Sequence, residues 1–583
     1  MPFYPPAWVP KCPEVPDTVS ISEFMFNEEY GRKPIAESLP AYIDGLTGKT
    51  IGVEEQKDRI QYLARALAKE FGWKVNEGTE HDKVCGVFAL NTIDVMTLNW
   101  AIHRLNGISS PANAAYSADE VRYQLANCEA KALFTVMPLL ETAIAGAKKA
   151  GLGRDRIYLL PMPGDDPSKY PKDIKTFDQL LEEGKSLPDL EPLKWEKGQG
   201  ARQTAFLCYS SGTSGLPKGV MISHRNVIAN TIQLAVFESV SRKQHGPNYH
   251  EVALGLLPQS HIYGLIVICH ASTYRGDSVI VLPKFDINQY LASIQKYKIT
   301  TLFIVPPIII NMVKQKELCA KYDLSSVRAI FTGAAPLSAE TAEDLSKQYP
   351  SWKIRQGYGL TETCTVVTAS TPEDIWFGSS GSLLPGYTAR VLSIEGNEIT
   401  GYDQPGELVV ASPSITLGYL KNDKATRETF VTLDDGLRYM RTGDEVVFRK
   451  APSGHEHIWI VDRIKELIKV KGLQVAPAEL EGFLLSHPAV ADCAVIPVPD
   501  DAAGELPKAY VVKSNSIGLE ESDVAVKRDI QKFVEREKAR HKWLKGGVEF
   551  IDVIPKSPSG KILRRMLRDK DRAERQKKKG AKL

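Results

Sequence analysis

The sequence lacks the features of a disulfide-rich, zinc-binding or strongly charged protein. Its 583 residues include only eight cysteines, and no two of them form a Cys-x-x-Cys pair. This pattern indicates neither a zinc site nor a disulfide framework, and it favours a reducing compartment. Lysine and arginine, 73 in all, nearly balance 71 aspartates and glutamates. The charge of the whole chain therefore predicts no nucleic-acid partner.

Long hydrophobic runs are also missing, and we expect no secretory leader. The most apolar stretches, near Ile266 and Ile308, are interrupted by histidine or proline before they reach membrane-spanning length, so we expect no transmembrane segment. The proline-rich first residues lack the basic and apolar regions of a signal peptide. At 583 residues the chain exceeds one ordinary hydrophobic core, which predicts two or more domains.

Strand-like and helix-like segments alternate along most of the chain. Residues 84–90 and 132–136 have the composition of strands and precede helix-like segments, which predicts doubly wound α/β subdomains. Turn-rich strand signals between residues 386 and 461 predict a β-rich subdomain after them. The α/β pattern then restarts with a helix-like segment at 478–485 and a strand-like one at 493–498. A large N-terminal body and a small C-terminal α+β domain are expected.

The boundary between these domains is predicted near Lys465. Residues 1–464 would form the large body and residues 465–563 the small domain. The remaining residues, 564–583, are rich in lysine and arginine, and we expect them to form a solvated basic tail.

A glycine- and hydroxyl-rich loop, Ser210-Ser-Gly-Thr-Ser-Gly-Leu-Pro-Lys-Gly219, is the most specific motif. Glycines let successive backbone N–H groups point into one concavity, hydroxyls add donors, and Lys218 supplies a cation, so the loop is suited to phosphate. It is not a Walker A motif, because Pro217 precedes the lysine and a strand-like segment follows. A surface linker is the alternative, which the strand-like segments at both ends disfavour.

Two further motifs carry groups that suit a nucleotide. In Gln356-Gly-Tyr-Gly-Leu-Thr-Glu-Thr363, Tyr358 would stack on adenine, Thr361 would donate to the α-phosphate and Glu362 would hold Mg²⁺. In Arg441-Thr-Gly-Asp444, one carboxylate would accept from the ribose hydroxyls. Taken alone, each of these motifs is as typical of an ordinary turn.

The last two motifs are basic. Asp462-Arg-Ile-Lys-Glu-Leu-Ile-Lys-Val-Lys-Gly-Leu-Gln474 places basic side chains around an apolar spine, and Pro555-Lys-Ser-Pro-Ser-Gly-Lys561 fixes a loop with one lysine at its end. Each alone is also typical of exposed surface.

In this order and spacing the five motifs strongly resemble the adenylate-forming superfamily of acyl-CoA synthetases, adenylation domains and luciferases, over nearly the whole chain. The chain is most similar to the 4-coumarate:CoA ligase-like group, through Pro258-Gln-Ser-His-Ile-Tyr-Gly264, Gly333-Ala-Ala-Pro336 and residues 470–480. The resemblance implies an ATP-dependent carboxylic acid:CoA ligase that works through an acyl-adenylate, with ATP, Mg²⁺ and coenzyme A. It also implies a mobile small domain.

The resemblance assigns the first half-reaction to matched positions. The β- and γ-phosphates would be held by the glycine-rich loop, the α-phosphate and Mg²⁺ by the Thr-Glu pair, adenine by two glycine-containing segments, ribose by an acidic and a basic residue, and the reacting carboxylate by a lysine. In that order the residues are Ser210, Ser211, Gly212, Thr213, Ser214 and Lys218; Thr361 and Glu362; Gly333, Ala334, Ala335, Gln356, Gly357 and Tyr358; Asp444 and Arg463; and Lys561.

For the second half-reaction the resemblance implies rotation about Lys465. Lys561 would leave, and the face from Lys469 to Gln474 would arrive, with Lys471 and Gly472 along the pantetheine channel. His261 would gate the thiol channel, and Lys284 would meet the phosphates of CoA. A lone histidine in an apolar run is otherwise a core residue. Gln259-Ser260 departs from the apolar residues of many relatives, which leaves the packing of the gate open.

The acyl pocket of this group is formed at positions matching Tyr263, Gly333, Gly357 and residues 363–367. Most of these side chains are small or apolar. They would accept an arylpropenoic, arylacetic or medium-chain fatty acid and supply no cation for a second carboxylate.

Alternative functions remain open at this point. A luciferase-like oxygenase or a carrier-loading enzyme would carry the same motifs, and a basic tail on an inactive ligase body would suit an anionic surface or RNA. The final Ala581-Lys-Leu583 is similar to the Ser-Lys-Leu address, so we expect recognition by the peroxisomal import receptor and otherwise a cytoplasmic protein.

Overall fold

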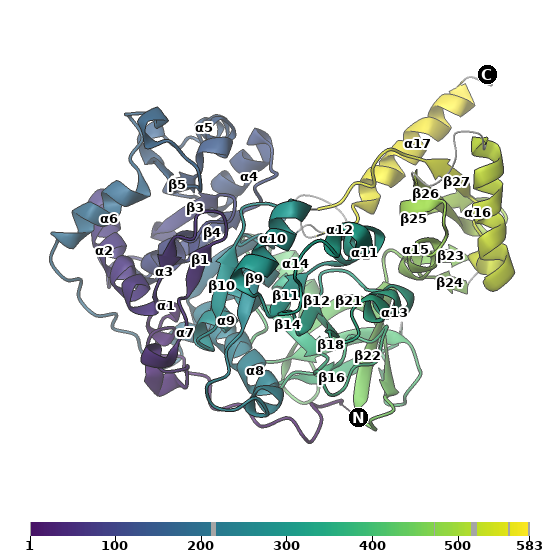
Figure 1. The fold of residues 1–583 in the computed structure, drawn as a ribbon, viewed down its shortest axis with the longest axis horizontal. Helices are drawn as coiled ribbons and strands as arrows, with labels where there is room; N and C mark the ends of the chain where they lie inside the picture. Colours follow the sequence, from purple (N-terminus) through teal and green to yellow (C-terminus); the bar gives the residue numbers. More distant parts are fainter. Residues whose placement is uncertain are drawn as a thin grey trace.

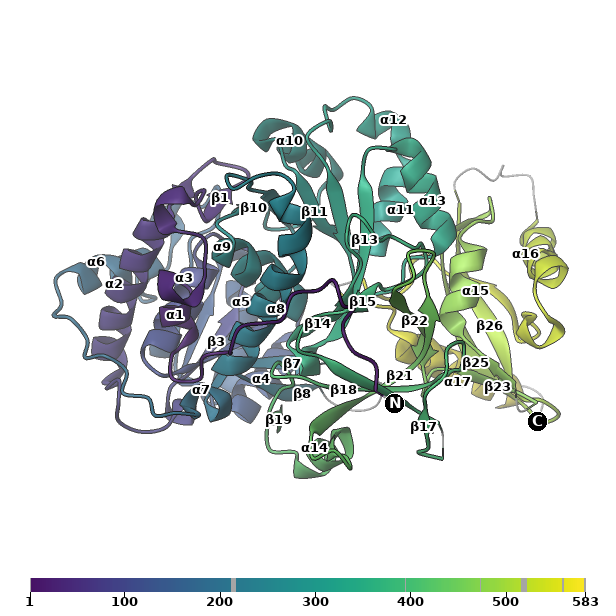
Figure 2. The same ribbon diagram turned by 90° about the horizontal axis from the view of Figure 1, so that it is seen from below.

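The computed structural model describes residues 2–210, 217–393, 395–471, 473–514, 522–557 and 560–580. Several predicted positions lie outside the described residues: Ser211, Gly212, Thr213, Ser214, Gly472 and residues 581–583. Figure 1 shows a large body with a smaller domain at one end, and Figure 2 shows the same arrangement from below.

The first sheet of the large body has the strand order β19-β8-β7-β4-β3-β5-β6. It is parallel from β7 to β6 and antiparallel where β8 and β19 are added. Its strands are β3 (Val84–Phe88), β4 (Ile108–Ala112), β5 (Ala132–Thr135), β6 (Ile157–Leu159), β7 (Thr204–Ser210), β8 (Lys218–Ser223) and β19 (Gly418–Tyr419).

Both faces of this sheet carry buried apolar side chains, and helices cover both faces. Figure 1 shows α4 and α5 on one face and α2 and α3 on the other. The helices of this part are α1 (Ile21–Phe24), α2 (Val53–Phe71), α3 (Val95–Arg104), α4 (Ala118–Cys128), α5 (Leu140–Lys149), α6 (Phe177–Lys185), α7 (Gln199–Arg202) and α8 (His224–Lys243).

The second sheet has the order β15-β14-β13-β12-β11-β9-β10-β1-β2 and is parallel from β13 to β1. Its strands are β1 (Tyr42–Asp44), β2 (Thr50–Ile51), β9 (Val252–Gly255), β10 (Ser278–Val281), β11 (Thr301–Ile304), β12 (Ala329–Thr332), β13 (Lys353–Leu360), β14 (Thr365–Ala369) and β15 (Ser382–Leu383). The associated helices are the π-helix η7 (Tyr263–Ala271), α9 (Ser272–Tyr274), α10 (Ile287–Tyr297), α11 (Pro306–Lys314), α12 (Lys316–Cys319), α13 (Ala339–Gln348) and the 3₁₀ turn η8 (Thr361–Thr363).

An antiparallel sheet completes the large body, with the order β17-β16-β18-β21-β20 and β22 paired to β21. Its elements are β16 (Thr388–Leu392), β17 (Glu398–Ile399), β18 (Gly406–Ala411), α14 (Asp423–Thr429), β20 (Phe430–Thr432), β21 (Arg438–Lys450) and β22 (Glu456–Arg463). The remaining 3₁₀ turns of the body are η1 (Glu28–Tyr30), η2 (Ile35–Glu37), η3 (Glu80–Asp82), η4 (Met137–Leu139), η5 (Arg154–Arg156) and η6 (Pro167–Lys169).

The small domain has its own sheet, β24-β23-β26-β25 with β27 parallel to β26, and its own apolar core. Figure 2 shows α15 of this domain beside α13 of the large body. The elements are β23 (Ile468–Val470), β24 (Leu473–Val475), α15 (Pro477–Leu484), β25 (Val490–Asp500), β26 (Gly504–Lys513), α16 (Asp523–Glu537), η9 (Arg540–Lys542), β27 (Gly547–Phe550) and α17 (Arg564–Gly580). Lys465 lies in the turn between β22 and β23.

The expectation of a solvated basic tail is wrong for the part of residues 564–583 that the structure describes. These residues form α17, whose Leu567 is 1% exposed and joins the apolar cluster of Ile496 and Tyr510. Asp571 of the same helix is buried and accepts from the Lys508 ammonium at 2.8 Å. Leu567 and Asp571 pack this helix against the small domain, which the basic average composition of the segment did not indicate.

The predicted doubly wound body, β-rich subdomain and small α+β domain are confirmed. Within the described residues, no helix combines the length and apolar character that a membrane crossing needs.

Candidate active site

The predicted metal carboxylate lies where three segments of the large body meet. Glu362 is in η8, directly after β13, and is buried. Ser210, at the end of β7, donates from Oγ to Glu362 Oε1 at 3.0 Å, and the Tyr419 hydroxyl of β19 donates to the same oxygen at 2.9 Å. Burial and the Glu362 carboxylate raise the pKa of Tyr419, so its hydroxyl keeps its proton and remains a donor.

The turn that carries Glu362 is fixed by its backbone. Cys364 and Thr365 have φ angles of 52° and 104°, in the left-handed region that residues with a Cβ seldom adopt. At Gly359 an added Cβ would lie 1.5 Å from the Thr365 carbonyl oxygen, so glycine is required there. Thr416 donates to the Glu362 carbonyl from both N and Oγ1 at 3.0 Å.

The donor set fits a hard cation that also binds phosphate. Within the described residues, no group of three or more His, Cys, Asp or Glu side chains could enclose a metal ion. Both hydroxyls at Glu362 donate to Oε1, and no described group donates a hydrogen bond to Oε2. One carboxylate oxygen with nearby phosphate suits Mg²⁺, which retains water and phosphate ligands.

The predicted ribose residues are brought together by strand pairing. Asp444 of β21 is the register partner of Arg463 of β22, and Arg463 Nε lies 3.5 Å from Asp444 Oδ1. The Tyr358 hydroxyl donates to Asp444 Oδ2 at 2.5 Å, which brings the predicted adenine ring residue beside the ribose pair. Burial raises the pKa of Asp444, and Arg463 opposes this effect.

The loop after β12 carries the other predicted adenine residues, Gly333, Ala334 and Ala335. Ala334 has a φ of 67°, a strained conformation for alanine. Gln356 holds this loop: its Oε1 accepts from Leu337 N at 3.2 Å and its Nε2 donates to Leu337 O at 3.3 Å. Both ends of the Gln356 amide are thus used to shape the loop, a supporting role that sequence reasoning did not assign.

The predicted acyl-pocket residues also converge. A Cβ added to Gly333 would lie 3.2 Å from Gly357 O and 3.7 Å from Tyr263 Cε1. The Tyr263 hydroxyl donates to Phe331 O at 2.6 Å. A Cβ on Gly357 would meet the Phe331 ring at 2.5 Å, so Phe331 forms the wall behind this glycine.

His261 lies in the bend just before η7 as a neutral imidazole. Burial, followed by the positive charge of Lys561, lowers its pKa to about 4. Its Nδ1 accepts from Tyr263 N at 3.3 Å, which leaves the proton on Nε2. Gln259, the polar departure noted in the sequence, is buried and accepts from Thr92 N at 3.1 Å, so its side chain is hydrogen-bonded within the fold.

Lys561 reaches this site from the small domain. A Cβ on Gly560, which has a φ of 82°, would lie 3.2 Å from Pro307 Cγ, so the lysine loop rests on the start of α11. Burial, followed by the charge of Arg463, lowers the pKa of Lys561 to about 8, and Glu466, Asp444 and Glu362 partly offset the shift. The small domain therefore presents Lys561 to the residues predicted for the nucleotide.

The residues predicted for CoA are not brought to this site. Lys469, Lys471 and Gln474 are exposed on the β23–β24 hairpin, and Leu473 between them is 53% exposed. Lys284, which follows β10, is also exposed. Among the described residues, those predicted for the first half-reaction lie together in this arrangement, and those predicted for CoA do not.

Two sets of supporting residues were missed from the sequence. Tyr419 lies in the two-residue strand β19, and Thr416 lies in the loop before it. This segment has no recognisable motif, and the glycine before Tyr419 is its one local signal. Arg564 was assigned to the tail, yet its guanidinium pairs with Glu466 and Glu481 at 2.6 Å each.

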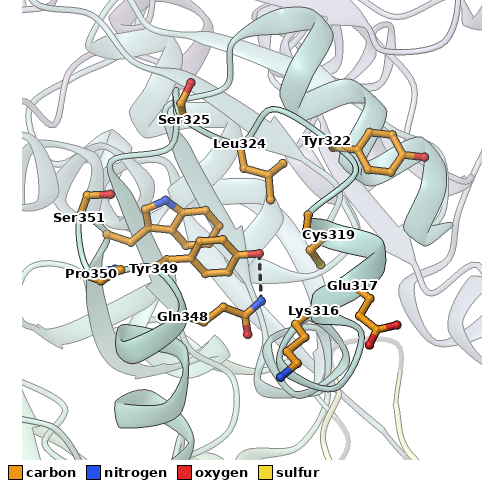
Figure 3. A pocket seen from close by; sticks show the side chains of 12 residues that line it. Lys316, Glu317, Cys319, Tyr322, Leu324, Ser325, Gln348, Tyr349, Pro350 and Ser351 are labelled. Atoms are coloured by element: carbon orange, nitrogen blue, oxygen red, sulfur yellow. Dashed lines mark hydrogen bonds between the residues drawn. The ribbon is translucent and has the colours of Figure 1, made fainter.

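One cavity of about 540 Å³ lies away from all of these groups, between α12 and the segment after α13. The Tyr349 ring stacks on Trp352 with centroids 3.9 Å apart. Figure 3 shows Tyr349 and the hydrogen bond from Gln348 to its hydroxyl. None of the predicted site residues lines this cavity, so we assign it no part in the site.

Comparison with known proteins identifies two matching family models. The model described as AMP-binding enzyme matches residues 36–420, and the AMP-binding enzyme C-terminal domain matches residues 479–561. The chain is 40% identical to acyl-CoA ligase easD of Emericella nidulans over 574 residues, covering 97% of this chain and 100% of the relative. It is also 40% identical to acyl-CoA ligase AFT1-1 of Alternaria alternata, covering 98% of this chain and 97% of the relative.

Solved structures share the fold at lower identity. The anthranilate CoA ligase AuaEII, in complex with anthranoyl-AMP, has a TM-score of 0.77 and 22% identity, covering 95% of this chain and 97% of that one. ATP-bound MatB from Rhodopseudomonas palustris has a TM-score of 0.76 and 24% identity, covering 94% and 98%.

Proposed function

Since the chain belongs to the AMP-binding enzyme family and is an AMP-forming acyl-CoA ligase, we propose that it activates an aromatic or medium-chain carboxylic acid with ATP and passes the acyl group to CoA. The proposed substrate class agrees with the resemblance of the chain to the 4-coumarate:CoA ligase-like group, which is part of this proposal. The observation that carries the proposal is the packing of the Lys561 loop on the large body, where Arg463, Asp444 and Glu362, from motifs far apart in the sequence, all influence the pKa of Lys561.

In the first half-reaction, a carboxylate oxygen attacks the α-phosphorus of ATP while the bond to the pyrophosphate oxygen breaks. Negative charge gathers on the phosphoryl oxygens, so catalysis consists mainly of positioning and of preorganised cations. Lys561 would bridge the attacking carboxylate and the α-phosphate, Lys218 would meet the outer phosphates, and Asp444 would accept from the ribose. Glu362 would hold Mg²⁺, which supplies positive charge to the phosphate oxygens when it is bound.

In the second half-reaction, the CoA sulfur attacks the acyl carbon and AMP leaves. The small domain would rotate about Lys465, so that Lys561 withdraws and the now exposed hairpin with Lys469, Lys471 and Gln474 approaches. Neutral His261 would move aside to open the thiol channel, a motion that costs no buried charge because its pKa is about 4.

The acyl pocket supports a substrate with a single carboxylate and an apolar remainder. Phe331, Phe303 and Tyr263 form an edge-to-face cluster, with Phe331 centroids 6.2 Å from both other rings. Behind Phe331 lies the Arg355 guanidinium, 5.2 Å from the ring centroid, and its charge is taken by Glu238 at 3.0 Å. These side chains therefore offer no unpaired cation to a second carboxylate.

The experiment that tests the function measures both half-reactions with a panel of acids. We expect acid-dependent ATP–pyrophosphate exchange, and CoA-dependent thioester formation, with arylpropenoic, arylacetic or medium-chain fatty acids. A preference for acetate or malonate would refute the pocket argument. Product formation that needs oxygen instead of CoA would favour the luciferase-like alternative.

Phe331 should limit the size of the acid. Phe331→Leu is expected to raise the kcat/KM ratio of a bulkier acid over a smaller one by about tenfold, the scale of one or two methylenes in an apolar pocket. Phe331→Tyr, which lengthens the ring, should lower that ratio. Pyrophosphate exchange with both variants and a homologous acid series measures it, and an unchanged ratio in both would remove Phe331 from the pocket wall.

We also propose that the protein is imported into peroxisomes. This proposal rests only on the sequence of residues 581–583. A fluorescent fusion ending in the natural tripeptide should colocalise with a peroxisomal marker, and one without the tripeptide should remain cytoplasmic. Equal import of both fusions would overturn this assignment.

A further inference from the structure

Tyr419 stands between the two charged groups expected to meet the nucleotide phosphates. Its strand β19 pairs antiparallel with β8, which puts Tyr419 opposite Val220 and beside Lys218 at the start of β8. The Lys218 ammonium lies over the Tyr419 ring, 4.7 Å from its centroid. On its hydroxyl side the same ring donates to Glu362 Oε1 at 2.9 Å.

The tyrosine keeps a cation and an anion apart. In the described part of the chain, no Lys218–Glu362 contact falls within the 4 Å of an ion pair, although both groups contact the same side chain. Opposite charges in a partly dry site attract strongly, so removal of the ring would let the ammonium neutralise the carboxylate. The ring face instead stabilises Lys218 through its quadrupole.

The hydroxyl also orients the carboxylate. Tyr419 and Ser210 both donate to Oε1, at 2.9 and 3.0 Å, so the other oxygen, Oε2, is turned away from these two donors. Hydrogen bonds to one oxygen of a ligating carboxylate fix its rotation and raise its affinity for a metal ion.

The segment around Tyr419 is rigid enough for this task. Tyr419 is 6% exposed, and its backbone N donates to Thr426 Oγ1 at 3.0 Å. Gly418 has a φ of 142°, and a Cβ there would lie 2.5 Å from Thr426 Cγ2, so glycine is needed for the chain to turn the tyrosine inward. Thr416 of the same segment holds the backbone carbonyl of Glu362 at 3.0 Å.

We propose that Tyr419 is a positioning residue that keeps Glu362 open to the divalent cation of the metal–nucleotide substrate and keeps Lys218 from neutralising it. The inference rests on the proposed function, because it needs a metal–ATP complex at this site. It assigns Tyr419 no contact with the reacting atoms.

The test uses Mn²⁺ as the probe and binding as the readout. Free and bound Mn²⁺ are measured by electron paramagnetic resonance, with the full-length protein and a non-hydrolysable ATP analogue. We expect Tyr419→Phe, which retains the ring and removes the hydroxyl, to weaken Mn²⁺ binding by about tenfold, the lower end of the effect of losing such a partner. Tyr419→Leu, which also removes the spacer, should weaken it further.

Two comparisons make the result specific. Tyr402→Phe removes a hydroxyl that donates to Glu456 at 2.8 Å on the exposed surface, and it should leave Mn²⁺ binding unchanged. In a Glu362→Gln background, Tyr419→Phe should cause no further loss, because the oxygen it orients no longer belongs to a carboxylate.

Each outcome separates the inference from its premise. If the unaltered protein binds no Mn²⁺ with the analogue, the metal–nucleotide part of the proposed function fails. If it binds Mn²⁺ and Tyr419→Phe binds it equally well, or if the Tyr419→Phe loss persists in the Glu362→Gln background, the role of Tyr419 is refuted. Matching thermal unfolding curves for the folded variants exclude a general loss of structure as the cause.

Discussion

Replacing Lys561 by alanine should slow acyl-adenylate formation by roughly 10² to 10³-fold, the scale of losing one preorganised donor. Its ammonium is brought to the pair of Asp444 and Arg463 by a loop that rests on the large body, so its contribution is confined to the charge that gathers at the α-phosphate. Thioester formation from supplied acyl-adenylate should proceed within a few-fold of normal, because that step does not need Lys561. Each half-reaction is assayed alone.

The same ammonium predicts a pH dependence. The pKa of Lys561 is lowered to about 8, mainly by burial, so the cation is lost as the pH rises through this value. We expect kcat/KM for ATP in adenylation to fall above about pH 8, since that parameter reports groups of the free enzyme. Bound phosphate favours the ammonium, so the decline in kcat should begin at a higher pH.

Lys561→Arg is the matched control, because a guanidinium stays charged over the whole range. Its adenylation rate should be lower than normal, since the side chain is longer, but it should lack the decline above pH 8. Equal loss of both half-reactions in Lys561→Ala, in a folded protein, would contradict the assignment. A decline above pH 8 that persists in Lys561→Arg would assign it to another group.

The sequence predicts the site through the order and spacing of its motifs. Glu362, Asp444 and Lys561 come from motifs that are individually weak, yet the structure brings Glu362 beside Ser210 and Asp444 beside Arg463. The fold was predictable because buried parallel strands such as β3 and β5 are continuous apolar runs that alternate with helix-like segments.

Supporting residues were beyond prediction because their roles depend on partners distant in the sequence. Tyr419 lies 57 positions from Glu362 and 201 from Lys218, in a two-residue strand that composition does not distinguish. Gln356 was expected near the nucleotide, yet both ends of its amide bind Leu337. The average composition of α17 is basic, because the residues that pack it against the small domain are few. Composition alone therefore did not predict that this helix packs there.

The residues on either side of the predicted hinge, Lys465, are held by different domains. Before it, Ile464 N donates to Gly443 O at 3.0 Å, which ties that residue to the large body. After it, Glu466 is held at 2.6 Å by Arg564, which also binds Glu481 of α15 and so ties that residue to the small domain. Lys465, between them, is exposed in a turn that is closed by hydrogen bonds from Glu466 N and Leu467 N to Arg463 O. We expect the rotation to be absorbed at Lys465 and to break these two bonds.

Lys465→Pro should therefore separate the two half-reactions in the opposite sense to Lys561→Ala. Proline fixes φ at this residue and restricts the one before it, which hinders any rotation away from the arrangement in which Lys561 already meets the nucleotide residues. Adenylation should stay within a few-fold of normal, and thioester formation should fall by roughly 10²-fold, as expected when reacting groups are held out of position. Pyrophosphate exchange and CoA-dependent consumption of supplied acyl-adenylate measure the two steps. Lys465→Ala, which removes the side chain and leaves φ free, should preserve both steps. An equal loss of both steps in a folded Lys465→Pro protein would mean that one fixed arrangement of the domains serves the whole reaction.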